Sequence, residues 1–255
     1  MTGKFKQWVA QQARARGYTV VPDWQLDRFA QARYLARLFE TLAIDCVLDV
    51  GANRGQYRDF LRQEVGYAGW VISFEPVPAL GAHLAQRAQA DPRWQVEPVA
   101  LGATPGTATL NVMASDTFSS FLAPNAAGTA MFATRNRVAE QAEVPVHTLD
   151  ARLPDLLART GCSRPYLKLD TQGYDLAVIE GAATCLPKIL ALQTEASVTP
   201  IYEDAPDFAT VIRQLEARGF ALSGMFPNNP DHFPRMIEFD CHMLNQSQLG
   251  AAPLG

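Results

Sequence analysis

The chain has 255 residues, is 48% hydrophobic and 19% charged, and carries a formal net charge of −4 at pH 7. This length allows one large α/β domain with a sizeable core. The acidic balance, with no block of Lys or Arg, disfavours an electrostatic track for nucleic-acid phosphates, so we expect no RNA or DNA partner.

The cysteines give no sign of a redox or metal motif. Cys46, Cys162, Cys185 and Cys241 form neither a C-x-x-C pair nor a cluster with histidine. The sequence also shows no signal-peptide core and no apolar run long enough to span a bilayer. We therefore expect a reducing, cytoplasmic setting.

Residues 1–44 are expected to form a helical segment that packs on or caps the domain. Phe5, Trp8 and Val9 among basic residues could form a short amphipathic helix that touches a membrane surface, although docking on the domain is the favoured interpretation. A longer helix then follows Asp23, which can cap it, and carries the apolar residues Leu26, Phe29, Leu38, Phe39 and Leu42. The domain itself is expected over residues 45–245, and residues 246–255 as a flexible tail.

Residues 47–55 predict a buried strand followed by a ligand-binding turn. Val47, Leu48 and Val50 suit a central parallel strand that is buried on both faces. Gly51 and Gly55 then let the backbone bend sharply and approach a ligand, and asparagine at position 53 tolerates a positive φ. An apolar helical stripe follows in Tyr57, Phe60, Leu61 and Val65.

An acidic residue ends the next apolar strand, 70–74. Glu75 lies 24 residues after Gly51, where an acid can accept hydrogen bonds from both hydroxyls of a ribose. The turn lacks the G-x-G-x-x-G spacing that suits a pyrophosphate, and the chain has no P-loop. An adenosine-type ligand without a recognised phosphate is therefore implied.

The rest of the chain alternates strand and helix patterns, which predicts a single doubly wound, Rossmann-like α/β sheet. A long loop over the site is expected at 114–128. The last strand is expected to run antiparallel to its neighbours. The expected strands are 94–100, 166–169, 189–193, 220–226 and 236–244, with helices around 153–157 and 208–215.

Four segments together resemble the FkbM family of S-adenosylmethionine (SAM) methyltransferases. They read LDVGANRGQY at 48–57, FEP at 74–76, LKLDTQGYD at 167–175 and LQTE at 192–195. The resemblance covers roughly residues 46–244. It implies a class I methyltransferase sheet of seven strands, SAM as methyl donor, and O-methyl transfer to a hydroxyl, often on a sugar of a surface polysaccharide or on a natural product.

The resemblance also implies which residues bind the cofactor. The glycine turn would pass beside the methionine part of SAM, Glu75 would hold the ribose, and residues 99–102 would line the adenine through backbone and apolar contacts. The implied cofactor residues are Asp49, Gly51, Ala52, Asn53, Gly55, Glu75, Pro76, Ala100, Leu101 and Asp170.

Two carboxylates at strand ends are the candidates for catalysis. Methyl transfer needs alignment of the acceptor oxygen and acceptance of its proton. Asp170 is the leading candidate for base or acceptor orienter, and Glu195 is the second; alternatively, Asp170 bonds only the methionine amino group and Glu195 caps local backbone. The candidates for acceptor contact are Ser119, Ser120, Tyr174 and His232. No set of three oxygen ligands is visible, so we expect no metal.

Two other classes of function stay open. A catalytically silent SAM-binding or regulatory domain would keep the segment from Gly51 to Glu75 and lose the acceptor side. A nicotinamide-dependent oxidoreductase would share the strand, turn and ribose acid, but it needs a turn that fits a pyrophosphate. The expected acceptor is a hydroxyl-bearing small molecule or glycan, and homo-oligomerisation stays open.

Overall fold

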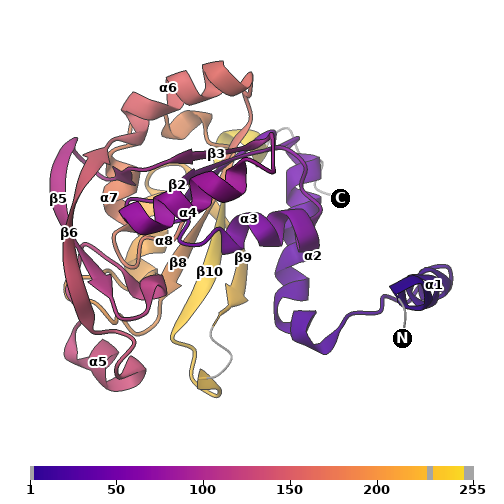
Figure 1. The fold of residues 1–255 in the computed structure, drawn as a ribbon. Coiled ribbons are helices and arrows are strands. Elements are labelled where there is room, and N and C mark those ends of the chain that lie inside the picture. Colours follow the sequence, from indigo (N-terminus) through magenta and orange to yellow (C-terminus); the bar gives the residue numbers. More distant parts are fainter. Residues whose placement is uncertain (1–2, 229–231, 250–255) are drawn as a thin grey trace.

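The computed structural model describes residues 3–228 and 232–249. Its centre is a seven-stranded sheet with the order β3-β2-β1-β7-β8-β10-β9 (Figure 1). Neighbouring strands are parallel from β3 to β8, whereas β10 runs antiparallel to both β8 and β9. The mostly parallel sheet predicted from the sequence is therefore confirmed. Its strands are β1 (Cys46–Val50), β2 (Trp70–Phe74), β3 (Trp94–Glu97), β7 (Pro165–Leu169), β8 (Ala191–Ser197), β9 (Phe220–Pro227) and β10 (Glu238–Asn245).

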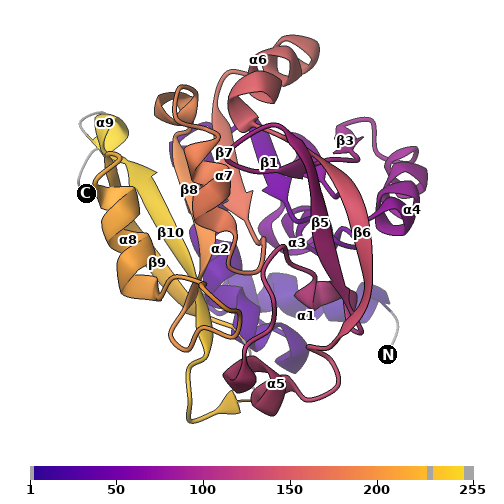
Figure 2. The same ribbon diagram turned by 90° about the vertical axis from the view of Figure 1, so that its left-hand side faces the viewer.

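Helices cover both faces of this sheet because its central strands are apolar on both sides. Val47 of β1 packs with Leu35 and Phe60 on one face, and Leu48, the next residue, packs with Leu153 and Val178 on the other. Figure 2 shows α7 and α8 in front of the sheet and α2 and α3 behind it. The helices are α2 (Leu26–Thr41), α3 (Gln56–Phe60), α4 (Pro78–Ala88), α6 (Leu149–Thr160), α7 (Asp175–Glu180) and α8 (Phe208–Glu216).

A second, three-stranded sheet corrects the expectation of one strand over 94–100. The chain leaves the main sheet after β3 and enters β4 (Ala100–Leu101) of the second sheet, whose order is β4-β6-β5. Pro98 lies between the two strands and has no N–H with which to continue a ladder. The other strands are β5 (Gly106–Met113) and β6 (Val138–His147), and the loop between them contains a 3₁₀ turn, η3 (Asp116–Phe118), and α5 (Ala126–Phe132).

The N-terminal segment divides into two unlike parts. Helix α2 packs on the sheet through Leu35 and Phe39. Helix α1 (Gly3–Arg14) instead stands apart from the body of the molecule (Figure 1), with Phe5 and Trp8 exposed by 46% and 56%. The sequence favours a first helix that docks on the domain, whereas in the described part of the structure this helix does not. The structure describes no side-chain placement for Lys4 and Lys6 of this helix.

A short helix occupies the start of the expected tail. Helix α9 (Gln246–Leu249) follows β10 directly, and Gln246 N–H donates to the carbonyl oxygen of Gly219 at 2.8 Å. The rest of the expected tail, 250–255, lies outside the described residues, as does part of the expected turn before β10, 229–231. No helix in the described ranges is long and apolar enough to cross a membrane.

Candidate functional site

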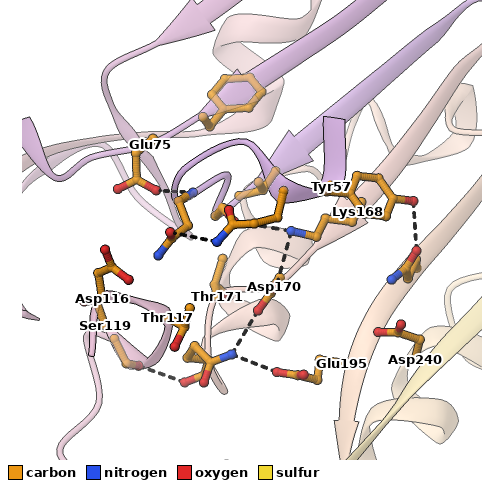
Figure 3. Close-up of a pocket in the computed structure, with 18 of the residues that line it drawn as sticks. Tyr57, Glu75, Asp116, Thr117, Ser119, Lys168, Asp170, Thr171, Glu195 and Asp240 are labelled. Atoms are coloured by element: carbon orange, nitrogen blue, oxygen red, sulfur yellow. Dashed lines mark hydrogen bonds and ion pairs between the residues drawn. The ribbon is translucent and has the colours of Figure 1, made fainter. Parts of the chain in front are cut away.

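A cavity of about 450 Å³ opens at the carboxyl ends of β1, β2, β7 and β8 (Figure 3). This volume falls in the range of small-molecule sites, and the edge is where open α/β sheets bind ligands. Segments that are far apart in the sequence meet at its wall. They contribute Asp27, Arg28 and Gln31 from α2, Gly51 and Asn53 from the turn after β1, Glu75 and Pro76 after β2, Ala100 and Leu101 of β4, Asp116, Thr117, Ser119 and Ser120 of the loop after β5, Lys168, Asp170, Thr171 and Gln172, Glu195, Asn228 and Asp240.

The turn after β1 requires glycine at its first position. Gly51 has φ +77°, and a Cβ placed there would lie 2.0 Å from the carbonyl oxygen of Asp170. No other residue fits this contact without moving β1 from β7. Asn53 follows with φ 50°, which confirms the expectation that asparagine accepts a left-handed conformation here.

The backbone N–H groups of this turn are already used within the protein. Those of Gly51 and Ala52 both donate to the Phe74 carbonyl oxygen at 3.1 Å. The N–H of Asn53 donates to Glu75 Oε2 at 2.7 Å, and that of Arg54 donates to the Gln56 side chain at 2.9 Å. A pyrophosphate needs such donors. The turn is therefore poorly suited to a dinucleotide.

Glu75 places a buried carboxyl group in the wall of the cavity. Its side chain accepts hydrogen bonds from the N–H of Asn53 and, at 2.9 Å, from the N–H of Val77. Burial raises its pKa to about 7, an effect that these two hydrogen bonds only partly offset. Two bonds leave carboxylate lone pairs for hydroxyl donors of a ligand.

Lys168 is a site residue that sequence reasoning missed. It lies opposite Asp49 in the register of β1 and β7, and its Nζ is 3.1 Å from Asp49 Oδ1 and 3.3 Å from Asp170 Oδ2. The same ammonium group donates to the Gly51 carbonyl oxygen at 3.3 Å. Burial would lower the pKa of Lys168, but the charges of Asp170 and Asp49 outweigh it and raise the pKa. The lysine thus ties the glycine turn to Asp170.

Gln172 joins the two candidate catalytic carboxylates. Its Nε2 donates to Asp170 Oδ1 at 2.9 Å and to Glu195 Oε2 at 2.8 Å (Figure 3). The Tyr202 hydroxyl lies 2.9 Å from Gln172 Oε1 and so orients the amide with its NH₂ group toward the acids. Gln172 also has φ 54°, an uncommon conformation for a residue other than glycine, asparagine or aspartate.

Glu195 lies in the most acidic part of the cavity. It is directly opposite Asp240 in the register of β8 and β10, and its Oε1 accepts a hydrogen bond from Asn228 at 2.7 Å. Burial raises the pKa of Glu195 well above its ordinary value, and the nearby charges of Glu238 and Asp170 raise it further. A carboxylate of raised pKa is a stronger proton acceptor.

The structure brings most of the predicted site residues to one cavity. Ser119 lines it, and so does Ser120, whose hydroxyl donates to the Gln172 carbonyl oxygen at 2.8 Å. Tyr174 instead packs against Phe121, with ring centroids 4.9 Å apart, and does not line the cavity. Three residues of the predicted cofactor set are buried and do not line the cavity: Asp49, Ala52 and Gly55.

His232, predicted to contact the acceptor, also lies off the cavity wall. Its ring packs edge-on against Phe132, with centroids 5.1 Å apart. Within the described ranges, no group of three or more His, Cys, Asp or Glu side chains is arranged to hold a metal ion.

The loop expected over the site does line the cavity, through Asp116, Thr117 and the two serines. Arg54, in the glycine turn, forms an ion pair with Asp116 at 2.6 Å, so the loop is tied to the cofactor side. Helix α2 closes another part of the wall with three polar residues that no sequence motif marked.

Comparison with known proteins identifies the family of this chain. The family model described as the methyltransferase FkbM domain matches residues 49–222, which include the glycine turn, Glu75 and both candidate carboxylates. The chain belongs to the FkbM methyltransferase family. It is accordingly a SAM-dependent methyltransferase. No curated protein matches its sequence.

Several solved structures are similar to this FkbM methyltransferase at low sequence identity. The FkbM methyltransferase of Methylobacillus flagellatus KT is 14% identical, with a TM-score of 0.50, over 96% of this chain and 71% of that one. Fibrillarin of Aeropyrum pernix, solved with SAM, is 12% identical over 84% and 74%, with a TM-score of 0.45. The magnesium protoporphyrin IX methyltransferase of Synechocystis PCC 6803 is 12% identical over 96% and 92%, with a TM-score of 0.43.

Proposed function

We propose that this FkbM methyltransferase transfers the methyl group of SAM to a hydroxyl oxygen, on a sugar of a glycan or on a hydroxyl-bearing natural product. The observation that carries the proposal is the placement of Glu75 and the linked pair Asp170 and Glu195 on the wall of one cavity. One end offers a ribose acceptor, and the other offers proton acceptors for a hydroxyl.

The cofactor end of the cavity fits SAM better than a dinucleotide. Glu75 has lone pairs for the ribose hydroxyls, while Pro76, Ala100 and Leu101 add apolar wall beside it. The amides of the glycine turn are engaged within the protein, so no pyrophosphate site is formed. These features support the adenosine and methionine parts of SAM as ligands of this end and argue against a nicotinamide oxidoreductase.

We propose that the two carboxylates at the other end have different roles. Lys168 and Gln172 both bind Asp170 and fix its position, which favours a role in anchoring the methionine ammonium or orienting the acceptor. Glu195 is the better proton acceptor, because burial and neighbouring acids raise its pKa. This assignment reverses the order expected from the sequence, in which Asp170 is the leading base.

The protein's part in such a transfer is mainly alignment and exclusion of water. SAM supplies an electrophilic methyl group on a sulfonium, and displacement requires the acceptor oxygen in line with it. Gln172 fixes the separation of Asp170 and Glu195, and the 116–120 loop covers the cavity. Glu195 would accept the hydroxyl proton as the new carbon–oxygen bond forms.

Two measurements test the proposal. Calorimetry should show binding of SAM and no binding of NAD at comparable concentrations. Incubation with isotopically labelled SAM and a library of hydroxyl-bearing glycans should then give a methylated product that mass spectrometry assigns to oxygen. Binding of SAM without turnover of any hydroxyl acceptor, together with methylation of an amine or carbon acceptor, would contradict O-methyl transfer; binding without any turnover would indicate the silent SAM-binding domain.

A further inference from the structure

Helix α1 exposes aromatic side chains that nothing in the described structure covers. Phe5 and Trp8 lie side by side, with ring centroids 6.1 Å apart, and both are largely exposed. The segment that follows adds Tyr18 and Val20, exposed by 71% and 55%. We call residues 3–20 the N-terminal arm. Large apolar side chains gathered on a free segment indicate a surface that binds something.

The charge of the N-terminal arm identifies the kind of surface it fits. The first 22 residues hold four basic residues and no acidic one, in a chain whose formal net charge is −4. Arg14 and Arg16 are exposed and pair with no acid in the described part of the chain, and Arg16 only folds back onto Gln12 at 3.0 Å. These cations are therefore free to meet anions outside the molecule.

We propose that the N-terminal arm binds an anionic lipid surface and holds the enzyme against it. A short helix with tryptophan and phenylalanine among basic residues is the composition that lies in the interface of a bilayer, with aromatic rings at headgroup level. Two large aromatic residues are a small apolar anchor, so the basic residues must supply much of the attraction, and an acidic surface is required.

A helix break isolates the N-terminal arm from the catalytic domain. Gly17, with φ +82°, follows the last helical turn, and residues 15–22 contain no helix or strand before the 3₁₀ turn at Asp23–Gln25 that leads into α2. Attachment of the arm therefore leaves the cavity unchanged, and SAM affinity should be the same with and without vesicles. This inference does not rest on the nature of the acceptor.

The test uses the whole chain and two kinds of vesicle, phosphatidylcholine alone and phosphatidylcholine mixed with phosphatidylserine. The protein should sediment with the acidic vesicles, less at about 0.5 M salt, and not with the neutral ones. Phe5→Ala with Trp8→Ala should abolish this binding. Arg14→Gln with Arg16→Gln should weaken it about 25-fold, at about fivefold for each basic residue.

Two arginines in and just after helix α8 provide a matched control for the charge change. Arg218 folds back onto Gln214 at 2.9 Å, as Arg16 does onto Gln12, and Arg213 is similarly exposed. Arg213→Gln with Arg218→Gln should leave vesicle binding unchanged. Equal loss in this control, equal binding to neutral vesicles, or no binding to acidic vesicles overturns the proposal. The proposal is also overturned if the wild-type chain is a dimer, the two aromatic substitutions make it a monomer, and lipid has no effect on either. Unchanged SAM affinity shows that each variant is folded.

Discussion

Glu75 is 4% exposed and burial raises its pKa to about 7, so the ribose contact proposed for this carboxyl group should make cofactor binding dependent on pH. Ribose hydroxyls donate to the ionised form, so SAM should bind more tightly as pH rises through about 7 and more weakly below it, by up to about tenfold per pH unit. Glu75→Gln should bind weakly at every pH, with a loss of about 1.5–3 kcal/mol at pH 8. Calorimetric titrations on either side of pH 7 measure the SAM Kd of the wild type and of this variant. A pH-dependent Kd that persists in the variant would assign the effect to another group.

Removal of the Lys168 ammonium group should destabilise the protein more than removal of an exposed lysine. Lys168→Met leaves Asp49 buried without its counter-ion, and loss of one partner of a buried pair costs about 3–5 kcal/mol. Because the pKa of Lys168 is raised by Asp170 and Asp49, its contribution is complete below the unfolded value of 10.5 and is lost only as pH rises through the folded value. Urea unfolding at neutral pH tests this, with the exposed Lys188→Met as control. Equal effects of the two substitutions would show that the pair contributes nothing.

Conservative substitutions at the two carboxylates separate the base from the anchor. If Glu195 takes the proton, Glu195→Gln should lower kcat by about 10²–10⁴ with SAM affinity nearly unchanged. Asp170→Asn should instead weaken SAM binding or raise the KM of the acceptor. The two kinetic constants and the SAM Kd decide the matter once an acceptor is found. The opposite pattern would restore Asp170 as the base.

Local motifs identify some site residues and cannot identify others. Gly51 and Glu75 follow from a strand, a turn and a second strand that are close in the sequence. Lys168 has no such signal, because its contact with the Gly51 carbonyl oxygen spans 117 positions of the chain. Gln172 likewise acquires meaning only when β8 brings Glu195 beside Asp170. Such roles come from the register of the sheet, which single-residue patterns do not specify.

Gly51 lies where the turn after β1 passes the end of β7, and we expect this position to tolerate no side chain. Gly51→Ala should cost more than about 3 kcal/mol of unfolding free energy, because the new Cβ meets the Asp170 carbonyl oxygen in addition to the strain of positive φ. Gly161 also has positive φ, +70°, but an added Cβ has nothing within 4 Å. Gly161→Ala therefore measures the conformational strain alone, at about 1–2 kcal/mol. Similar losses in the two variants would remove the steric argument.

At the level of elements, the sequence predicts those helices and strands that have their own local apolar pattern. The order of β1, the turn, α3 and β2 agrees with the structure because each step has its own apolar pattern and its own glycine or acid. The split at Pro98 was missed, because the run from Trp94 to Ala100 is apolar enough for one strand. The second sheet was also missed, since Gly106 of β5 pairs with Val146 of β6 across a long insertion.

The whole molecule should be more stable at mildly acidic pH than above neutrality. Burial raises the pKa of Glu75 and Glu238 to about 7, so their ionisation destabilises the folded state as pH rises from the unfolded value of 4.5 to about 7. Burial lowers the pKa of His242 to about 3, so this histidine makes the folded state more stable as pH rises toward 6.5. It is a single group against two carboxyl groups, so the fall in stability should prevail. Urea unfolding between about pH 5 and pH 8 should show this fall. Glu238→Gln should flatten it, whereas the exposed Glu216→Gln should not. A free energy of unfolding that rises over this interval would contradict the assignment.

The wall of the cavity has a consequence for how enzymes of this kind diversify. The segment shared with the family, 49–222, supplies the glycine turn, Glu75 and both carboxylates. Other polar residues of the wall lie outside this segment: Asp27, Arg28 and Gln31 of α2, Asn228 after β9, and Asp240 of β10. If the acceptor lies beside Glu195, as proposed, change in these flanking elements should alter which acceptor is admitted and leave the glycine turn and Glu75 unchanged. On this proposal, exchange of α2 between relatives should change acceptor preference without changing the affinity for SAM.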